Sequence, residues 1–321
     1  MKRSLISAST LALALLAGSA QAAEFELKLG HVANEDNSWH QAFEKFAELV
    51  EQKSAGRLEI QLYPNSQLGN ETDLINGIQL GIVDMTMSGE TLQNWAPKAA
   101  LLAVPYALRD SAHLQQVAGG ELGREVEQQI TERTGLVPLT WFERGARELT
   151  SNKPVKTPED LKGMIVRVPN VPLFVSAWQA MGAKPTPMAF GEVFTSLQQG
   201  AIHAQENPLS LIDSASFFEV QKYVNRTDHV RSWIYVLIGK RQLEQLPEEL
   251  QQILMESAKE MQAYERTLFT QAEAELEAKL KEKGMEFVDV DQAAFKAKAL
   301  EAVRKTLDAE QLELFNKIQA I

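Results

Sequence analysis

A long segment without glycine, and without proline after its first residue, runs from residue 247 to residue 283 and constrains the fold most. Proline suits the first turn of a helix and glycine its end, so Pro247 and Gly284 predict one continuous helix. At ~1.5 Å per residue this helix would be roughly 50 Å long. Its apolar positions do not keep a strict heptad, which argues against a coiled coil. Because the length exceeds one small domain, we expect two domains with the helix lying along both.

Strand-like and helix-like patterns alternate in the N-terminal part of the chain. Residues 25–29 alternate apolar and polar side chains and residues 58–62 form a second mostly apolar run, so both are predicted strands. Between them, Phe43 and Phe46 share one face of a helix predicted to begin near Trp39. This order of strand, helix and strand is typical of the start of an α/β domain.

A short sequence pattern occurs twice, in separate halves of the chain. Residues 71–80 predict a helix that ends at Gly81 and leads into a strand at 83–87. IQLGIVD at 78–84 is similar to LQQGAIH at 197–203, and each copy combines a helix end, a glycine and an apolar entry to a strand. We interpret the pair as two domains of similar topology. A chance similarity between two helix ends is the alternative.

Three polar residues fall at the ends of predicted elements within residues 161–208. Arg167 and Asn170 lie at the end of a strand predicted at 164–168, and Asn207 follows two further predicted helices. Open α/β sheets bind ligands at such positions. The Arg167 guanidinium cannot lose its charge, so within an apolar strand it needs an anionic partner or water. A small carboxylate fits it through both oxygens, and an internal pair with an acidic residue is the alternative.

Three longer motifs carry a family resemblance. They read GMIVRVPN at 163–170, MGAKPTPMAFGEVFTSLQQG at 181–200 and QENP at 205–208. In combination they resemble the solute-binding proteins of tripartite ATP-independent periplasmic (TRAP) transporters, of the DctP family. The resemblance extends from about residue 25 to the end of the chain. It implies an α/β fold, that of a two-domain periplasmic binding protein (type II-like) with a hinge and a long helix spanning both domains.

The resemblance also implies ligand contacts, position by position. The arginine of RVPN binds the substrate carboxylate in this family, and that position is Arg167. The asparagine of QENP is a ligand contact and falls on Asn207, while the aromatic residue of PMAF lines the pocket and falls on Phe190. A second arginine contact falls on Arg147. His203-Ala204 stands where the family usually has Asp-Gly, which leaves the local turn geometry open.

Further polar and aromatic residues complete the expected ligand site. Glu71 ends LYPNSQLGNE, another motif similar to the family, in which this position often lies near the pocket. A favourable charge in the first turn of a helix is the alternative for Glu71. Ser88 and Gly89 follow a predicted strand and should face the cleft. Asn170 is expected to match ligand hydroxyls, and Trp141 to shape the apolar wall.

The first 22 residues have the features of a secretory signal peptide. Lys2 and Arg3 precede a short apolar run, and Ala20-Gln21-Ala22 matches the small-x-small cleavage pattern. The apolar run is too short to span a bilayer. We therefore expect cleavage after Ala22, export, and a periplasmic location.

The mature chain is expected to cross between its two domains at residues 146–151 and again near 228–233. These crossings divide it into domain I, residues 23–146 plus 232–270, and domain II, residues 147–231 plus 271–321, with the long helix of about 247–283 shared.

Composition argues against several classes of function. The net charge of −11 argues against nucleic-acid binding. The chain has no cysteine, its five histidines are scattered, and no short catalytic or metal-binding motif occurs. We therefore expect no metal site, no cofactor and no enzyme activity. A secreted hydrolase based on paired carboxylates is a remote alternative, because such carboxylates need no short motif.

These features together predict the extracytoplasmic solute-binding subunit of a TRAP transporter, which closes around a small organic acid. The hydroxyl-matching side chains favour a sugar acid such as a uronate or aldonate, with sialic acid and C4-dicarboxylates as alternatives. The resemblance further implies delivery to the TRAP integral-membrane permease, transport driven by an ion gradient rather than by nucleotide, and a monomer.

Overall fold

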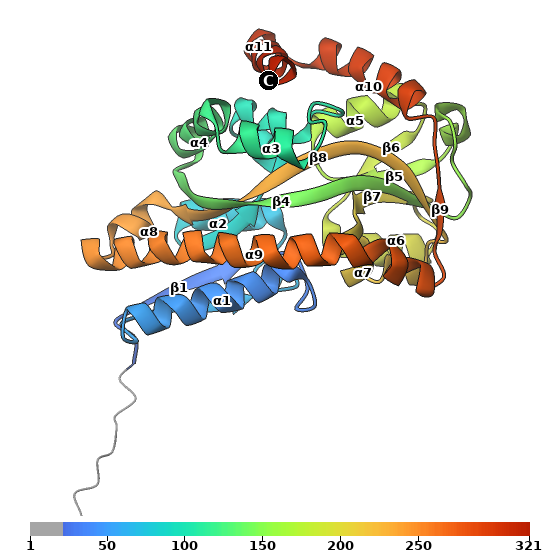
Figure 1. The fold of residues 1–321 in the computed structure, drawn as a ribbon. Coiled ribbons are helices and arrows are strands. Elements are labelled where there is room, and N and C mark those ends of the chain that lie inside the picture. Colours follow the sequence, from blue (N-terminus) through green and yellow to red (C-terminus); the bar gives the residue numbers. More distant parts are fainter. Residues whose placement is uncertain (1–21) are drawn as a thin grey trace, which may run out of the picture.

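One sheet of nine strands extends through the whole molecule. The computed structural model describes residues 22–321, so nearly all of the predicted signal peptide lies outside the described residues. The strand order is β2-β1-β3-β8-β4-β7-β5-β6, and β9 pairs with β8. Figure 1 shows α1 and α9 on one side of the long strands β4 and β8, and α3, α4, α5, α10 and α11 on the other.

The bounds of the elements follow the chain order. Up to the first long strand they are β1 (Phe25–Gly30), α1 (Ser38–Lys53), β2 (Leu58–Tyr63), α2 (Glu71–Leu80), β3 (Met85–Ser88), α3 (Ser111–Ala118), α4 (Glu121–Thr134) and β4 (Leu136–Ser151). The next are β5 (Ile165–Val168), α5 (Pro172–Ala180), β6 (Lys184–Pro187), α6 (Val193–Gln198), β7 (Ala204–Pro208), α7 (Leu209–Ser214) and β8 (Tyr223–Gly239). The last are α8 (Lys240–Glu244), α9 (Glu248–Glu282), β9 (Glu286–Val288), α10 (Gln292–Thr306) and α11 (Ala309–Ala320).

Each half of the sheet contains the same unit of three parallel strands and two helices. In domain I, β1 pairs in parallel with β2 and β3, and in domain II, β5 pairs in parallel with β6 and β7. Gly81 follows α2 and Gly200 follows α6, with φ of 78° and 71°, in the left-handed region that favours glycine. The predicted internal similarity between the halves is therefore confirmed.

The two units are joined through the long antiparallel strands β4 and β8. β3 pairs with residues 235–238 of β8, and β7 pairs with residues 147–151 of β4. Because β4 and β8 are antiparallel, these two stretches lie at opposite ends of the β4–β8 pair. The apolar runs at 136–142 and 235–238 by themselves would predict much shorter strands, because the charged residues beyond them resemble a loop. In β4 the charges of Arg144 and Arg147 are paired and buried, and in β8 Arg231 pairs with the half-buried Asp228, so both strands continue through their charged residues.

The long strands are irregular where they pass from one half of the sheet to the other. The register of β4 against β8 shifts between Arg144 and Arg147 and again between Arg147 and Leu149. Asp228, on the opposite strand, has a positive φ of 39°. We call this stretch, residues 143–149 of β4 with 225–232 of β8, the hinge segment. It overlaps the two crossings that the sequence proposes, at 146–151 and 228–233.

Helix α9 confirms the predicted long helix to within one residue at each end. Leu250, Leu254 and Met261 belong to the core that α9 forms with α1 and with domain I strands. Leu280 belongs to a separate core with Val193 and other domain II residues. A fully buried leucine contributes about 1.5–3 kcal/mol, so both ends of α9 are firmly attached, each to its own domain.

The C-terminal helices contact both parts of the molecule. Helix α10 packs on α5, whereas in α11 the Gln311 Nε2 donates to the Pro97 carbonyl oxygen at 2.9 Å. His113 Nε2 contacts the Ile318 carbonyl oxygen at 3.0 Å. Helix α11 therefore lies against residues that our division places in domain I, although the division assigns α11 itself to domain II.

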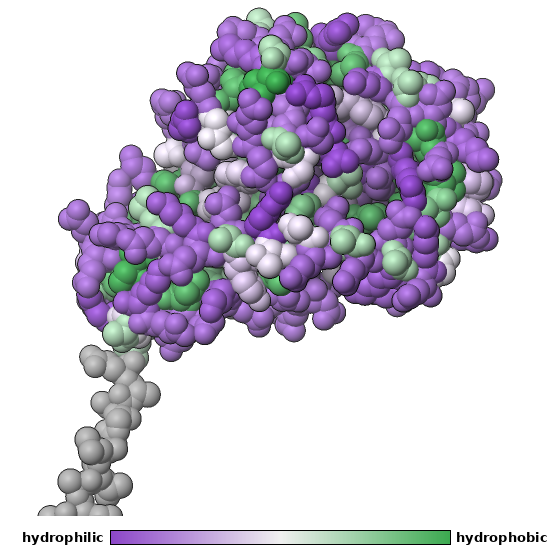
Figure 2. All heavy atoms as spheres, in the orientation of Figure 1, coloured by the Kyte–Doolittle hydropathy of each residue, from purple (hydrophilic) through white to green (hydrophobic). Residues whose placement is uncertain are grey.

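The molecular surface is mostly hydrophilic on the face shown in Figure 2, with hydrophobic residues scattered over it. Leu80 and Ile82 are the most exposed large apolar side chains of the described residues. Within residues 22–321, no helix has the length and apolar character needed to cross a membrane.

Candidate functional site

A cavity of about 490 Å³ lies between the two domains and is called the cleft pocket below. It opens at the carboxyl ends of β1, β5 and β6 and at the first turn of α2, as expected for ligand sites of open α/β sheets. Its lining residues from domain I are Val32, Asn70, Glu71, Thr72, Asp73 and Thr91, and those from domain II are Arg167, Pro169, Asn170, Pro187, Met188, Ala189, Phe190 and Glu192.

Arg167 is the buried cation of the cleft pocket. Its side chain is 3% exposed, and its Nε and Nη2 both donate to the Met188 carbonyl oxygen, at 2.9 and 2.6 Å. Among the residues that the structure describes, no carboxylate lies within ion-pair distance of this guanidinium. Burial lowers the pKa of Arg167 to about 10, although Glu206 opposes the shift. A cation so placed can bind an incoming carboxylate with little competition from the protein.

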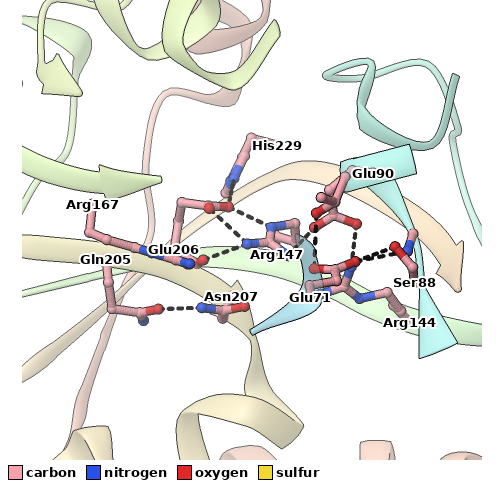
Figure 3. Close-up of polar contacts among 12 residues, drawn as sticks. Glu71, Ser88, Glu90, Arg144, Arg147, Arg167, Gln205, Glu206, Asn207 and His229 are labelled. Atoms are coloured by element: carbon pink, nitrogen blue, oxygen red, sulfur yellow. Dashed lines mark hydrogen bonds and ion pairs between the residues drawn. The ribbon is translucent and has the colours of Figure 1, made fainter. Parts of the chain in front are cut away.

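Arg147 is in contrast fully engaged by carboxylates of the protein. Its Nε and Nη2 donate to Glu206 at 2.5 and 2.7 Å, and its Nη1 donates to Glu90 at 3.1 Å. Figure 3 shows Arg147 between Glu206 with His229 on one side and Glu90 on the other. Arg147 does not line the cleft pocket, so a ligand contact there requires one of these bonds to be replaced. That contact stays a prediction.

The Arg147 pair strongly stabilises the charge on Glu206. Burial alone would favour the neutral acid, but Arg147, through its charge and its hydrogen bonds, and His229 lower the pKa of Glu206 to about 2. His229 Nε2 lies 2.8 Å from Glu206 Oε2. The cluster therefore joins Glu206 of β7 to both strands of the hinge segment, through Arg147 of β4 and His229 of β8.

Arg144 also pairs with a residue that the sequence did not indicate. The sequence alone suggests a pair with the adjacent Glu143 or exposure to water, but its Nη1 binds Glu90, and its guanidinium lies 5.5 Å from the Trp39 ring centroid. Glu143 instead binds Arg266 of α9. The reason for this correction is the alternation of side chains along β4, which turns adjacent residues to opposite faces of the sheet.

Glu71 brings a carboxylate to the domain I wall of the cleft pocket. It lies in the first turn of α2, beyond the capping residue Asn70. Its oxygens accept hydrogen bonds from Ser88 Oγ, from Thr91 Oγ1 at 2.9 Å and from Gly89 N at 3.3 Å. Burial and the nearby Glu90 raise the pKa of Glu71. Ser88 and Gly89 do not line the pocket themselves and act on it by holding Glu71.

The remaining predicted contacts on the domain II side divide into two groups. Asn170 and Phe190 line the cleft pocket, and Asn94 Nδ2 of domain I donates to the Asn170 carbonyl oxygen at 3.0 Å. Asn207 is buried at the end of β7, where its Nδ2 donates to Gln205 Oε1 at 2.7 Å, and it does not line the pocket. Its predicted ligand contact stays a prediction.

Comparison with known proteins identifies the family. The bacterial extracellular solute-binding protein family 7, DctP, matches residues 29–310. The chain belongs to this family. It is 53% identical over 305 residues to a solute-binding protein of Roseobacter denitrificans, covering 95% of this chain and 94% of the relative. It is 38% identical over 286 residues to the 2,3-diketo-L-gulonate-binding periplasmic protein YiaO of Escherichia coli, covering 88% and 87%.

A solved structure supports the same assignment at the level of the fold. It is a TRAP periplasmic solute-binding protein from Roseobacter denitrificans with bound L-galactonate, and it has 53% sequence identity and a TM-score of 0.91. The match covers 92% of this chain and 99% of that chain. The DctP-family protein described here thus has the two-domain α/β fold with a long helix, and its family consists of solute-binding transport proteins rather than enzymes.

Two sequence-derived expectations are changed by the structure of this DctP-family protein. Trp141 does not shape the wall of the cleft pocket, because its side chain lines a separate cavity beside α9. His203, at the unusual His203-Ala204 position, directly precedes β7, where its Nδ1 accepts a hydrogen bond from Ile165 N at 3.1 Å, and it lines a different cavity. The departure from the family pattern is therefore outside the cleft pocket.

Several residues of the DctP-family pocket were missed from the sequence. Asp73 and Glu192 both line it, and each accepts a hydrogen bond from the backbone amide three residues earlier. The repeat could have revealed them, because aligning Gly81 with Gly200 also aligns these two acids. No comparable sequence pattern identifies Thr91 as a pocket residue. Among residues 22–321, no group of three or more potential ligand side chains could hold a metal ion.

Proposed function

We propose that this DctP-family protein is the extracytoplasmic solute-binding subunit of a TRAP transporter and captures a sugar acid in the cleft pocket. The observation that carries the proposal is Arg167, a buried guanidinium that lines the pocket without an acidic partner among the described residues. Its free donor capacity suits one carboxylate of the ligand. Hinge closure of the two domains then surrounds the ligand with groups from both sides.

The opposite wall of the cleft pocket favours hydroxyl groups over a second carboxylate. Glu71 and Asp73 line this wall, and Glu192 lines the domain II side. Carboxylates accept hydrogen bonds from hydroxyls strongly, but they repel a second negative charge. This arrangement supports a polyhydroxylated monocarboxylate, such as an aldonate or uronate, over a C4-dicarboxylate.

The relatives support the same class of ligand. The Roseobacter denitrificans protein was solved with L-galactonate, and the Escherichia coli relative binds 2,3-diketo-L-gulonate. Both are sugar acids that carry one carboxylate and several oxygen substituents. We take L-galactonate as the first ligand to test. Sialic acid is the alternative, and the thermal-shift panel described below distinguishes between the two.

The cellular setting of the proposal follows from the family and the N-terminal sequence. The family binds organic acids and works with TRAP membrane subunits. Residues 1–22 act as a cleaved signal peptide that exports the chain to the periplasm, where the loaded, monomeric protein docks on the permease. Residues 1–21 lie outside the described part of the structure.

A thermal-shift panel tests the proposed function. The mature protein is heated with L-galactonate, D-galacturonate, sialic acid, succinate and galactitol, the neutral alditol of the galactonate skeleton. A ligand at 100 times its dissociation constant adds about 2.7 kcal/mol, which is several degrees in a protein of this size. We expect a shift with a sugar acid and none with galactitol or succinate. A shift with succinate alone would contradict the proposal.

A further inference from the structure

A second cavity, separate from the cleft pocket, lies between α3, β4 and α9. Its volume is about 260 Å³, and none of its lining residues lines the cleft pocket. Trp141 and Glu143 of β4 form one side and Glu265 of α9 another. This cavity adjoins the hinge segment, because Glu143 is the first residue of that segment on β4.

Glu265 is the unusual group of this cavity. Its side chain is 1% exposed, and it makes no hydrogen bond or ion pair with any described residue. The neighbouring cation is already engaged: Arg266 binds Glu143, which also accepts from Ser111 Oγ at 2.9 Å and Gln115 Nε2 at 2.8 Å. The protein therefore neutralises Glu143 and leaves Glu265 without a partner.

A second carboxyl group of α9 lies further along the hinge segment. Glu273 Oε1 is buried without a hydrogen-bond partner, and it lies so close to Gly145 that a Cβ there would be 2.6 Å away. Arg231 of β8 and Glu143 of β4 are the charged groups that act on Glu273. The Glu273 carboxyl therefore lies directly against the backbone of the hinge segment.

Helix α9 has no fully buried apolar side chain where it passes the hinge segment. Its buried side chains stop at Glu265 and resume at Leu276. The helix is attached to each domain by its ends, and its middle presents carboxyl groups to the strands that must bend. A change in the charge of these groups therefore acts on the part of the molecule that domain motion deforms.

A buried carboxylate without a hydrogen-bond or ion-pair partner loses the free energy of its hydration, so such a carboxyl group favours its neutral form. Burial, with a smaller contribution from Glu143 and against the influence of Arg266, raises the pKa of Glu265 to about 8. Lys259, which also lines the cavity, and the amides Gln115 and Gln262 are the other polar groups there. None of them makes a hydrogen bond or an ion pair with Glu265.

We propose that Glu265 is a proton-binding site that controls the hinge. The protonated acid favours the conformation seen here, in which the carboxyl is enclosed between α9 and β4. Loss of the proton favours a conformation in which α9 separates from the hinge segment and water reaches the carboxylate. If the cleft pocket has its proposed function, this equilibrium makes sugar-acid capture dependent on pH. The proton site itself does not depend on the ligand.

The proton site can be tested directly by carbon-13 NMR of the glutamate carboxyl groups. Burial also raises the pKa of Glu148 in the hinge segment to about 8, so more than one carboxyl resonance of the wild-type protein should titrate well above the ordinary glutamate range. We expect one of these resonances to be absent from Glu265→Gln. Glutamine keeps the shape of the neutral acid, so this variant should fold. Glu275→Gln, at an exposed position of the same helix, is the matched control and should retain the resonance. A Glu265→Gln spectrum that retains all of these resonances would overturn the proposal.

Its effect on the hinge is tested without ligand by fluorescence energy transfer between the domains. The chain has no cysteine, so cysteines placed at the exposed positions Glu51 and Gln179 can be labelled specifically. Between pH 6.5 and 9.5 we expect the transfer efficiency of the wild type and of Glu275→Gln to change and that of Glu265→Gln to stay constant. A constant efficiency in the wild type, or an equal change in Glu265→Gln, would overturn the coupling to the hinge. Failure of L-galactonate to bind would instead contradict the proposed function alone.

Discussion

The guanidinium of Arg167 holds the backbone carbonyl oxygen of Met188 through two nitrogens, Nε at 2.9 Å and Nη2 at 2.6 Å. This contact joins the ends of two parallel strands, β5 and β6, at the wall of the cleft pocket. It fixes the plane of the guanidinium without neutralising its charge. Arg167 is thereby oriented in advance for a planar carboxylate, which reduces the entropy that binding would otherwise cost.

Replacing Arg167 tests this orientation. Arg167→Gln should weaken L-galactonate binding at least about 100-fold, because hydrogen bonds to charged groups contribute roughly 1.5–3 kcal/mol each and two are lost. The melting temperature should not fall, since the variant removes a buried charge that has no acidic partner among the residues that the structure describes. Isothermal titration calorimetry measures the affinity. Arg304→Gln, at an exposed position of α10, is the control and should bind as the wild type does.

Breaking the Arg147 cluster should lower the free energy of unfolding more than breaking any single exposed ion pair does. Glu206→Gln leaves Arg147 with one carboxylate, and loss of one partner of a buried ion pair costs about 3–5 kcal/mol. Glu260→Gln removes an exposed partner of Lys53 and should cost at most about 1 kcal/mol. Urea unfolding of both variants gives the comparison. Equal losses would show that the Arg147 cluster does not stabilise the fold as described.

Glu71 should make the cleft pocket prefer polyhydroxylated monocarboxylates to dicarboxylates. Glu71→Gln keeps the hydrogen bonding of Ser88 and Thr91 possible but removes the charge from that wall of the pocket. L-galactonate affinity should fall about tenfold or more, because an ionised acceptor becomes a neutral one. Succinate should bind the variant better than the wild type. Calorimetry with both ligands checks this, and an unchanged preference would remove Glu71 from the ligand-discriminating groups.

His31 should make the fold sensitive to acid. Burial, helped by the nearby His40, lowers the pKa of His31 to about 3 from its ordinary 6.5. Between these values the unfolded chain binds a proton that the folded chain does not, so the free energy of unfolding falls as pH decreases from about 6.5 toward 3. His31→Gln should show a smaller fall than the wild type in urea unfolding at several pH values. His203→Gln changes an exposed histidine, so its free energy of unfolding should fall with decreasing pH as that of the wild type does.

Much of the fold was predictable because its signals are local. Pro247 and Gly284 set the ends of the long helix, and the two glycine-terminated helix ends revealed the repeated unit. The length of β4 was not predictable, because Arg144 and Arg147 resemble loop residues until their partners are known. Those partners, Glu90 and Glu206, are distant in the sequence and reach them only through the tertiary fold.

The candidate site was predictable where a residue acts alone and not where it acts through others. Arg167 combines a charge with an apolar strand, and the structure indeed leaves it without an acidic partner among the described residues. Ser88 was expected to face the cleft but instead supports Glu71. Trp141 was placed in the wrong cavity, because the sequence does not show which face of β4 meets α9.

The central claim is that one carboxylate of the ligand binds Arg167. Calorimetric titration of the mature protein with L-galactonate and with galactitol tests it most directly, because the two share a carbon skeleton and differ in the carboxylate. We predict saturable binding of L-galactonate to one site and no detectable binding of galactitol. Galactitol binding with an affinity close to that of L-galactonate would contradict the account, because the carboxylate would then contribute nothing.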